Sequence, residues 1–195
     1  MSVDEHFWWY LSRASGMVAW IALAATCLWG ILLITRMLKP ADRPAWLLDL
    51  HRWLGAVTVV TVFVHVLVLL GDGYMEPTLT QLFVPFATGW AHESLAANRL
   101  AYAFGIVALY LLLIVEISSL LIKKLPRKVW STIHLSSYIV FVLSTVHGVM
   151  AGSDAANIVF ICTLVAVAAI LAFSFTARVL QGRAKRLSRA ALSSR

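Results

Sequence analysis

Four histidines stand inside otherwise apolar stretches of this sequence, and they form two pairs with similar spacing. His51 and His65 lie fourteen residues apart in HRWLGAVTVVTVFVH, and His134 and His147 lie thirteen residues apart in HLSSYIVFVLSTVH. On an α-helix these intervals correspond to rises of roughly 21 and 20 Å. Because metal–imidazole bonds are only about 2 Å long, two histidines so far apart on one helix cannot bind the same metal ion. Each histidine therefore needs a partner from another element at the same depth.

The composition indicates that membrane-spanning helices must position these side chains. Hydrophobic residues make up 61% of the 195 residues, which is far more than in soluble domains. A bilayer core about 30 Å thick requires roughly 20 apolar residues per helix. Five such runs lie near residues 14–34, 47–70, 100–122, 132–151 and 158–179, followed by a basic tail over 180–195. Each run is continuously apolar, which predicts an all-α integral membrane bundle of five helices in one domain, residues 1–195, rather than a barrel.

The basic residues predict the orientation of this bundle. Fourteen of the sixteen Lys and Arg fall on one side of the five runs, and only Arg13 and Arg99 fall on the other. The basic side is expected to be cytoplasmic, with the amino terminus outside and the carboxyl terminus inside a plasma or inner membrane. The net charge of +7 is therefore explained by topology rather than by nucleic-acid binding. The long external connection, residues 71–98, is expected to hold an interfacial or re-entrant segment, because its apolar part is too short to span.

The two histidine-bearing runs, the second and the fourth, cross in the same direction, so their histidines match in depth. His51 is expected to face His134 near the cytoplasmic side, and His65 to face His147 near the outside. Ligation of iron in two stacked hemes by one pair each uses all four histidines at once. On an ideal helix, the thirteen-residue interval places His147 about 140° from His134 around the helix axis. A local bulge or kink is therefore expected between them.

The same residues leave a heme-free alternative open. Intramembrane histidines also serve proton or metal transporters, and a membrane segment can act as an assembly anchor. Transport usually requires acidic groups beside the histidines, and apart from Asp49 at the very start of the second run, Glu116 is the only carboxylate within a predicted span. Glu116, with Ser118 and Ser119 nearby, is a candidate for proton relay or propionate binding. It is explained equally well as an acidic side chain near a helix end that extends toward the membrane surface.

The two histidine segments, with RKVWSTIH leading into the second, resemble the ferric reductase-like transmembrane domain. NADPH oxidases, ferric reductases and the heme-binding membrane subunit of the periplasmic methionine sulfoxide reductase system share this domain. The resemblance covers roughly residues 47–179 and is most specific in the histidine spacing. It implies two hemes b with bis-histidine ligation, one held by His51 and His134 and the other by His65 and His147. The family has six spans in the oxidases, whereas five are expected here.

The resemblance implies an oxidoreductase component that moves electrons from the cytoplasmic side to an external acceptor. The sequence contains no GxGxxG motif and is not expected to hold a flavin or nicotinamide site. A separate flavoprotein, another reductase subunit or a membrane quinol is therefore the expected donor. Oxygen, a ferric chelate or a periplasmic protein are the candidate acceptors, and the sequence does not choose among them.

Further residues are weaker candidates for heme binding. Gly55 lies one turn after His51, and Gly148 directly follows His147. Because glycine has no side chain, a flat macrocycle could approach the backbone at these positions, although helix packing explains the glycines equally well. Phe141 lies two turns after His134 and is a candidate to sit between the hemes. Basic side chains expected near propionates are Arg43, Arg52, Arg127 and Lys128 on the cytoplasmic side and Arg99 on the outer side. The orientation rule alone also explains most of these charges.

Overall fold

Every long apolar run of the sequence is helical in the computed structural model, which describes residues 5–35, 45–73, 75–90 and 92–193. The elements are α1 (Glu5–Thr35), α2 (Ala45–Leu69), α3 (Leu79–Phe83), α4 (Glu93–Ala97), α5 (Arg99–Leu120), α6 (Arg127–Leu135), α7 (Ser137–Ala151), η1 (Ser153–Ala156) and α8 (Ile158–Ser193). The described ranges contain no β-strand. Five segments are long and apolar enough to cross a bilayer: Phe7–Ile34, Ala45–Leu69, Arg99–Leu120, Arg127–Ala151 and Ile158–Ala184. The all-helical, multi-pass architecture expected from the sequence is therefore confirmed.

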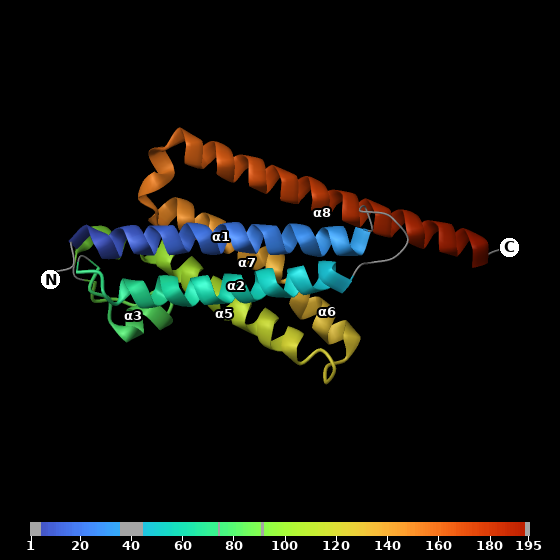
Figure 1. The fold of residues 1–195 in the computed structure, drawn as a ribbon, viewed down its shortest axis with the longest axis horizontal. Coiled ribbons are helices and arrows are strands. Elements are labelled where there is room, and N and C mark those ends of the chain that lie inside the picture. The colour runs from blue at the N-terminus through green and yellow to red at the C-terminus, as the bar shows by residue number, and fades with distance from the viewer. Residues whose placement is uncertain (1–4, 36–44, 74, 91, 194–195) are drawn as a thin grey trace.

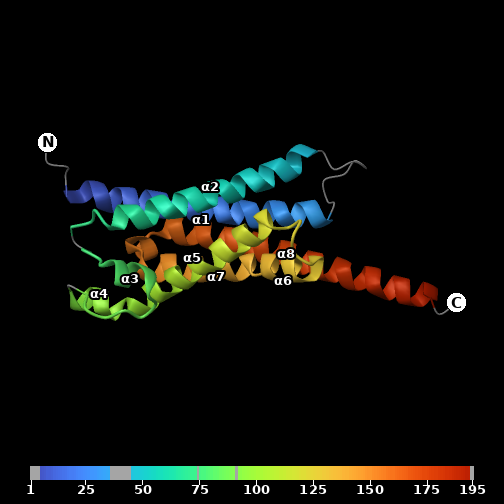
Figure 2. The same cartoon turned by 90° about the horizontal axis from the view of Figure 1, so that it is seen from below.

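Helix α1 is the central element of the bundle. It lies antiparallel beside α2 along most of its length, and it also contacts α7 and α8 (Figure 1). Helix α5 packs mainly on α7, as the view in Figure 2 shows. The short helices α3 and α4 lie at the end where α1 begins, and α6 and the last turns of α8 lie toward the opposite end. This arrangement places α1, α2, α5 and α7 around a common interior.

The interior is filled by apolar side chains from four helices. The buried cluster consists of Leu23, Ala24, Cys27, Ile31, Ala108, Leu112, Val140, Phe141 and Leu171. The outer faces are also apolar: Phe173 of α8 and Leu67 of α2, for example, are 72% and 62% exposed. Apolar side chains on both the inside and the outside of a helical bundle are typical of a protein surrounded by lipid.

The helix that carries His134 and His147 is interrupted between the two residues. Helix α6 ends at Leu135, α7 begins at Ser137, and the N–H of Ser136 donates to the carbonyl of Ile133 at 3.0 Å, three residues earlier. A turn closed in this way rotates the chain by more than 100° per residue. It therefore brings His147 closer to the face that His134 occupies and reduces the angular mismatch that the thirteen-residue spacing implies.

Two other segments refine the expected boundaries. Residues 79–83 form a single short helix whose start is closed by a capping box between Thr78 and Gln81. It ends at Phe83, and its C-cap Val84 directly precedes Pro85. The last helix does not stop near residue 179 as expected. Helix α8 continues to Ser193, so the basic tail extends the last span as a helix.

Candidate functional site

The structure brings the four intramembrane histidines together in two pairs. His65 of α2 and His147 of α7 have ring centroids 6.4 Å apart, and the ring planes are inclined by 76°. His51 of α2 and His134 of α6 have centroids 5.9 Å apart, inclined by 68°. We call these pairs the His65/His147 site and the His51/His134 site. They are the pairs that matching depth predicts.

Hydrogen bonds fix the rings of the His65/His147 site. Nδ1 of His65 lies 2.9 Å from the carbonyl oxygen of Ser12, and Nδ1 of His147 lies 2.8 Å from the carbonyl oxygen of Ala101. A carbonyl can only accept, so each Nδ1 carries the hydrogen and donates it. In a neutral ring, Nε2 is then left with a free lone pair, and this is the arrangement found in metal-ligating histidines.

Glycine makes room for both of these rings. A β-carbon placed on Gly16 of α1 would lie 3.2 Å from Cε1 and Nδ1 of His65, and one placed on Gly105 of α5 would lie 2.9 Å from the same atoms of His147. In each case the glycine follows the accepting carbonyl by four residues, one helical turn. Each imidazole therefore rests on a glycine and donates to the carbonyl one turn before it.

The His51/His134 site repeats part of this arrangement. A β-carbon on Gly30 of α1 would lie 3.3 Å from Cε1 of His51. Nδ1 of His51 is buried beside the backbone of Thr26, four residues before Gly30, but makes no hydrogen bond of good geometry within the described part of the chain. Nδ1 of His134 lies 3.3 Å from Oγ of Ser119, whose own hydroxyl donates to the carbonyl of Val115. The Ser119 oxygen is therefore free to accept a hydrogen bond from Nδ1 of His134. As in the other site, this leaves the free lone pair of His134 on its Nε2.

The spacing of these supports matches the spacing of the histidines. Gly16 and Gly30 are fourteen residues apart on α1, as are His65 and His51 on the antiparallel helix α2. On α5, Gly105 and Ser119 are also fourteen residues apart. Their partners His147 and His134 are only thirteen apart, on the helix that is interrupted at Ser136. The interruption therefore lets His134 and His147, thirteen residues apart, align with Ser119 and Gly105, which are fourteen residues apart on α5.

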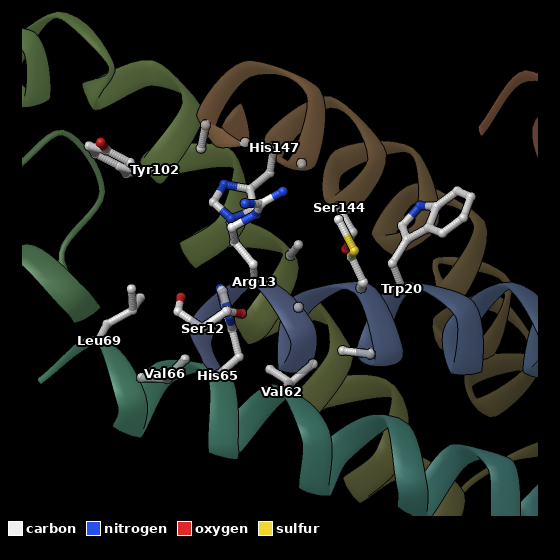
Figure 3. Close-up of a pocket in the computed structure, with 18 of the residues that line it drawn as sticks. Ser12, Arg13, Trp20, Val62, His65, Val66, Leu69, Tyr102, Ser144 and His147 are labelled. Carbon is white, nitrogen blue, oxygen red and sulfur yellow. The ribbon is translucent and has the colours of Figure 1, made fainter. Parts of the chain in front are cut away.

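A cavity of about 710 Å³ surrounds the His65/His147 site. Figure 3 shows His65 and His147 directed toward each other from α2 and α7, with Ser12 and Arg13 of α1 beside them and Trp20 farther along α1. The volume lies within the usual range of about 300–1,000 Å³ for pockets that bind cofactors and small molecules. Its lining includes Gly148, where a β-carbon would meet nothing within 4 Å. The His65/His147 site therefore has space for a large planar group.

An ion pair closes one wall of this cavity. Nε of Arg13 donates to Oδ2 of Asp154 in η1 at 3.1 Å, and a second bond joins its Nη2 to Oδ1. The guanidinium also lies 4.2 Å from the ring centre of Trp9. Both charged residues line the cavity. The outer cation expected from the sequence was Arg99, but Arg99 lies exposed at the start of α5, and Arg13 is the arginine in the cavity.

Several predicted site residues lie elsewhere than expected. Gly55 does not offer an open face: a β-carbon there would lie 2.9 Å from Oε1 of Glu116, so the carboxylate of α5 fills that space. Arg52 is at the surface, 3.6 Å from Asp49, and Arg127 is exposed at the start of α6. Lys128 is exposed as well, and Arg43 lies outside the described residues. In this structure Gly55 therefore packs against Glu116 and Arg52 lies at the surface, and the expectation that they bind a cofactor stays a prediction.

Phe141 is buried in the core between the two sites along α7. Its ring stacks on Trp20 of α1 with centroids 5.8 Å apart and planes inclined by 28°. Nε1 of Trp20 donates to Oγ1 of Thr145 at 2.8 Å. The aromatic pair therefore fills the space between α1 and α7 at the level between the two sites.

Sequence reasoning missed the residues that support the histidine rings. Their signal was present, because a small residue precedes a glycine by four positions in Ser12–Gly16, Thr26–Gly30 and Ala101–Gly105. Small residues at this spacing let membrane helices approach closely. They do not show which side chain will enter the space, so only the packing of α1 on α2 and of α5 on α7 identifies them as supports for imidazole.

A family comparison agrees with this geometry. Residues 15–145 match the family described as ferric reductase like transmembrane component, a range that includes His51, His65 and His134 and ends two residues before His147. No curated protein and no solved structure gives a significant match to the chain. Because the family match covers more than half of the chain, the protein belongs to the ferric reductase like transmembrane component family.

Proposed function

We propose that this chain is a transmembrane diheme electron carrier of the b type, with one heme held by His65 and His147 and the other by His51 and His134. Membership in the family makes the chain a membrane electron-transfer component of an oxidoreductase, and ferric reductase-like domains generally bind heme. The number of hemes and their ligands are the part that we infer from the geometry of the two histidine pairs.

The distance between the rings in each pair is the observation that carries this proposal. A metal–imidazole bond is about 2 Å long, and the ring centre lies about 1 Å beyond the ligating nitrogen, so two imidazoles that held one metal atom from opposite sides would have centroids about 6 Å apart. The measured separations are 5.9 and 6.4 Å. Both pairs therefore fit a single metal atom between them.

The protonation state of the His65/His147 site supports the same conclusion. Both rings donate through Nδ1 to a backbone carbonyl, so both Nε2 atoms are acceptors. Two acceptors cannot hydrogen-bond to each other, so a direct contact does not explain why the rings face one another. A Lewis acid between them satisfies both lone pairs.

The small number of protein ligands favours heme over a bare metal ion. Within the described ranges, no group of three or more His, Cys, Asp or Glu is placed to hold a metal ion. Each site therefore offers two protein ligands, and a macrocycle supplies the equatorial ones in a heme. The open face at Gly148 and the cavity volume fit a planar group at the His65/His147 site. Heme b, when bound, supplies one-electron redox chemistry.

The residues of the chain have three tasks in this function. The glycines and carbonyls of α1 and α5 hold the imidazoles in one orientation, so that the ligating nitrogens do not need to reorganise. Trp20, Phe141 and the surrounding apolar core exclude water between the two sites. The bundle keeps one site toward each end of the membrane-spanning helices, so that electrons can enter at one face and leave at the other.

We infer the direction from the distribution of charge. The described basic residues Lys123, Lys124, Arg127 and Lys128 lie at the end of the bundle that holds the His51/His134 site. That site would then face the cytoplasm and be the one at which electrons enter, and the His65/His147 site would be the one from which they leave. A separate flavoprotein, reductase subunit or quinol donates the electrons, and an acceptor outside the membrane receives them. The long connection over residues 71–98 contributes Asp72, Gln81 and Trp90 to the cavity wall and shields the His65/His147 site at that face.

The experiment that tests the proposal is an absorption spectrum of the purified protein from heme-replete cells. We expect reducible bands of low-spin b-type heme and two hemes per chain by pyridine hemochromogen assay. Protein that is folded by size-exclusion chromatography but has no such bands contradicts the electron-carrier function and supports the transporter or anchor alternative.

A further inference from the structure

A cation without a described acidic partner lies near the His51/His134 site. Arg178 of α8 is half-buried, and its Nη1 donates to the hydroxyl of Tyr138 of α7 at 2.8 Å. Tyr138 follows His134 by four residues, so this bond places the guanidinium about one helical turn from His134 along the chain. Arg178 lies near the basic end of the last candidate span, Ile158–Ala184, where a half-buried charge is stabilised by an opposite charge or an anionic ligand.

The described part of the chain does not provide that opposite charge. Arg13 pairs with Asp154 and Arg52 with Asp49, whereas Arg178 is in no ion pair within the described ranges. Arg178 therefore differs from Arg13, the arginine at the other site, which is neutralised by a bidentate carboxylate. A guanidinium has five N–H donors, and the neutral hydroxyl of Tyr138 takes one of them. Most of the hydrogen-bonding capacity of Arg178 is left for an anionic acceptor.

Two further donors lie on the same helical face as His134. Trp130 precedes His134 by four residues and Tyr138 follows it by four, so all three share one face apart from the small rotation at Ser136. The indole of Trp130 stacks on the ring of His134 with centroids 5.0 Å apart, and its Nε1 is buried without a hydrogen-bond partner in the described ranges. The hydroxyl of Tyr138 accepts from Arg178 and so keeps its own hydrogen for donation.

The position of this group of donors is fixed by packing. The ring of Tyr138 makes an edge contact with Phe175 of α8, with centroids 4.9 Å apart, and Phe175 lies one turn before Arg178. Helices α7 and α8 are therefore joined here by one aromatic contact and one hydrogen bond. The donors belong to α6, α7 and α8: Trp130 lies one turn before His134, and Tyr138, which carries Arg178, lies one turn after it.

We propose that Arg178 and Tyr138 form a carboxylate receptor that holds a propionate of the heme bound by His51 and His134, with Trp130 as a further donor on the other side of the same histidine. The inference rests on the proposed diheme function and assigns the inner propionate to α8, rather than to Arg52 or Arg127. A carboxylate accepts several hydrogen bonds at once, and a charge-assisted bond to guanidinium is among the stronger ones in proteins. The same oxygen chemistry is offered by a lipid phosphate, which the experiment must separate from propionate.

The test measures heme retention by the purified diheme protein in lipid-depleted maltoside micelles, which contain no phosphate. Transfer of heme to excess apomyoglobin is followed for the wild type and for Arg178→Gln, Arg178→Lys, Tyr138→Phe and Trp130→Phe. We expect one of the two hemes to leave about tenfold faster in Arg178→Gln, as the loss of one charge-assisted hydrogen bond predicts, while the other heme is unaffected. Arg178→Lys keeps the charge and should lie between wild type and Arg178→Gln.

A redox titration measures the midpoint potential of each heme, which would not change if Arg178 had a purely structural role. Removing a cation beside one heme should lower the midpoint potential of that heme in Arg178→Gln, and Arg178→Lys should restore most of the loss. The matched control is Arg183→Gln, because Arg183 is an exposed arginine of the same helix, and both its rates and its potentials should equal those of the wild type.

Each remaining outcome has a defined meaning. Unchanged heme release and unchanged potentials in Arg178→Gln overturn the receptor and leave the diheme function intact. An effect that appears only after phospholipid is added back assigns Arg178 to a headgroup phosphate and also overturns it. Wild-type protein without heme overturns the proposed function itself, which is seen in the spectrum before any variant is compared. A variant that fails to fold is replaced by Tyr138→Phe, for which we expect a smaller acceleration of the same heme.

Discussion

Gly105 of α5 lies directly against the imidazole of His147 on α7, so closely that a β-carbon at position 105 would fall 2.9 Å from Cε1 and Nδ1 of the ring. The same ring donates from Nδ1 to the carbonyl of Ala101, one turn earlier on α5. The glycine and the carbonyl together determine where the free nitrogen of His147 points. The orientation of this ligand is therefore set by a helix other than its own.

The substitution Gly105→Ala should disturb the His65/His147 site alone. The added methyl group cannot be placed without moving a hydrogen-bonded ring, so we expect heme content to fall from two toward one per chain. The matched control is Gly182→Ala on α8, where a β-carbon meets nothing within 4 Å and alanine favours the helix. Pyridine hemochromogen assay per chain measures both. Full heme content in Gly105→Ala contradicts the supporting role of this glycine.

The sequence predicted the histidine pairs well because their depth depends on simple helical arithmetic. A rise of about 1.5 Å per residue places His51 beside His134 and His65 beside His147 as soon as the two runs are known to cross in the same direction. The five spans follow equally directly from the length of the apolar runs. These features are local, or depend only on topology.

The partners of the rings could not be predicted in the same way. Gly55 is the glycine nearest to His51 along the chain, yet it makes room for Glu116, whereas Gly30 of α1 packs on His51. Arg52 is adjacent to His51 but lies at the surface, whereas Arg178, 44 residues after His134, bonds to Tyr138 one turn from that histidine. Which neighbouring helix covers a given face is a tertiary property, and proximity along the sequence does not determine it.

Phe141 should behave as a packing residue whose shape matters more than its ring. Phe141→Ala removes a buried side chain from the core cluster and should lower the free energy of unfolding by about 3–5 kcal/mol. Phe141→Leu keeps most of the volume and should cost less than about 1.5 kcal/mol. Both are measured by denaturation in mixed micelles. A loss as large in Phe141→Leu as in Phe141→Ala would show that stacking on Trp20 is essential.

The pair of Arg13 and Asp154 should contribute to stability only as a unit. Asp154→Asn leaves a partly buried guanidinium without its charge partner, and we expect the free energy of unfolding to fall by about 1–3 kcal/mol. Adding Arg13→Gln to that variant should recover part of the loss, because the uncompensated charge is removed. A double-mutant cycle measures the coupling. Strictly additive effects would show that the two residues act independently.

The orientation of the bundle is tested by reporter fusions. A reporter after Arg195 should be cytoplasmic, and one inserted near Asp72 should be external, because fourteen of the sixteen basic residues lie on one side of the spans. Alkaline phosphatase and green fluorescent protein report the two compartments. An external carboxyl terminus would reverse the direction of electron flow that we propose.

Heme stoichiometry in histidine variants tests the central claim most directly. Each of His65→Ala and His147→Ala should reduce heme content toward one per chain, and the double variant should be scarcely worse, because both changes damage one site. Combining His65→Ala with His134→Ala should remove nearly all heme, because that pair of changes damages both sites. Size-exclusion chromatography first confirms that each variant is folded. If His65→Ala combined with His134→Ala instead retains one heme, while His65→Ala combined with His147→Ala retains none, the pairing of the four histidines is contradicted.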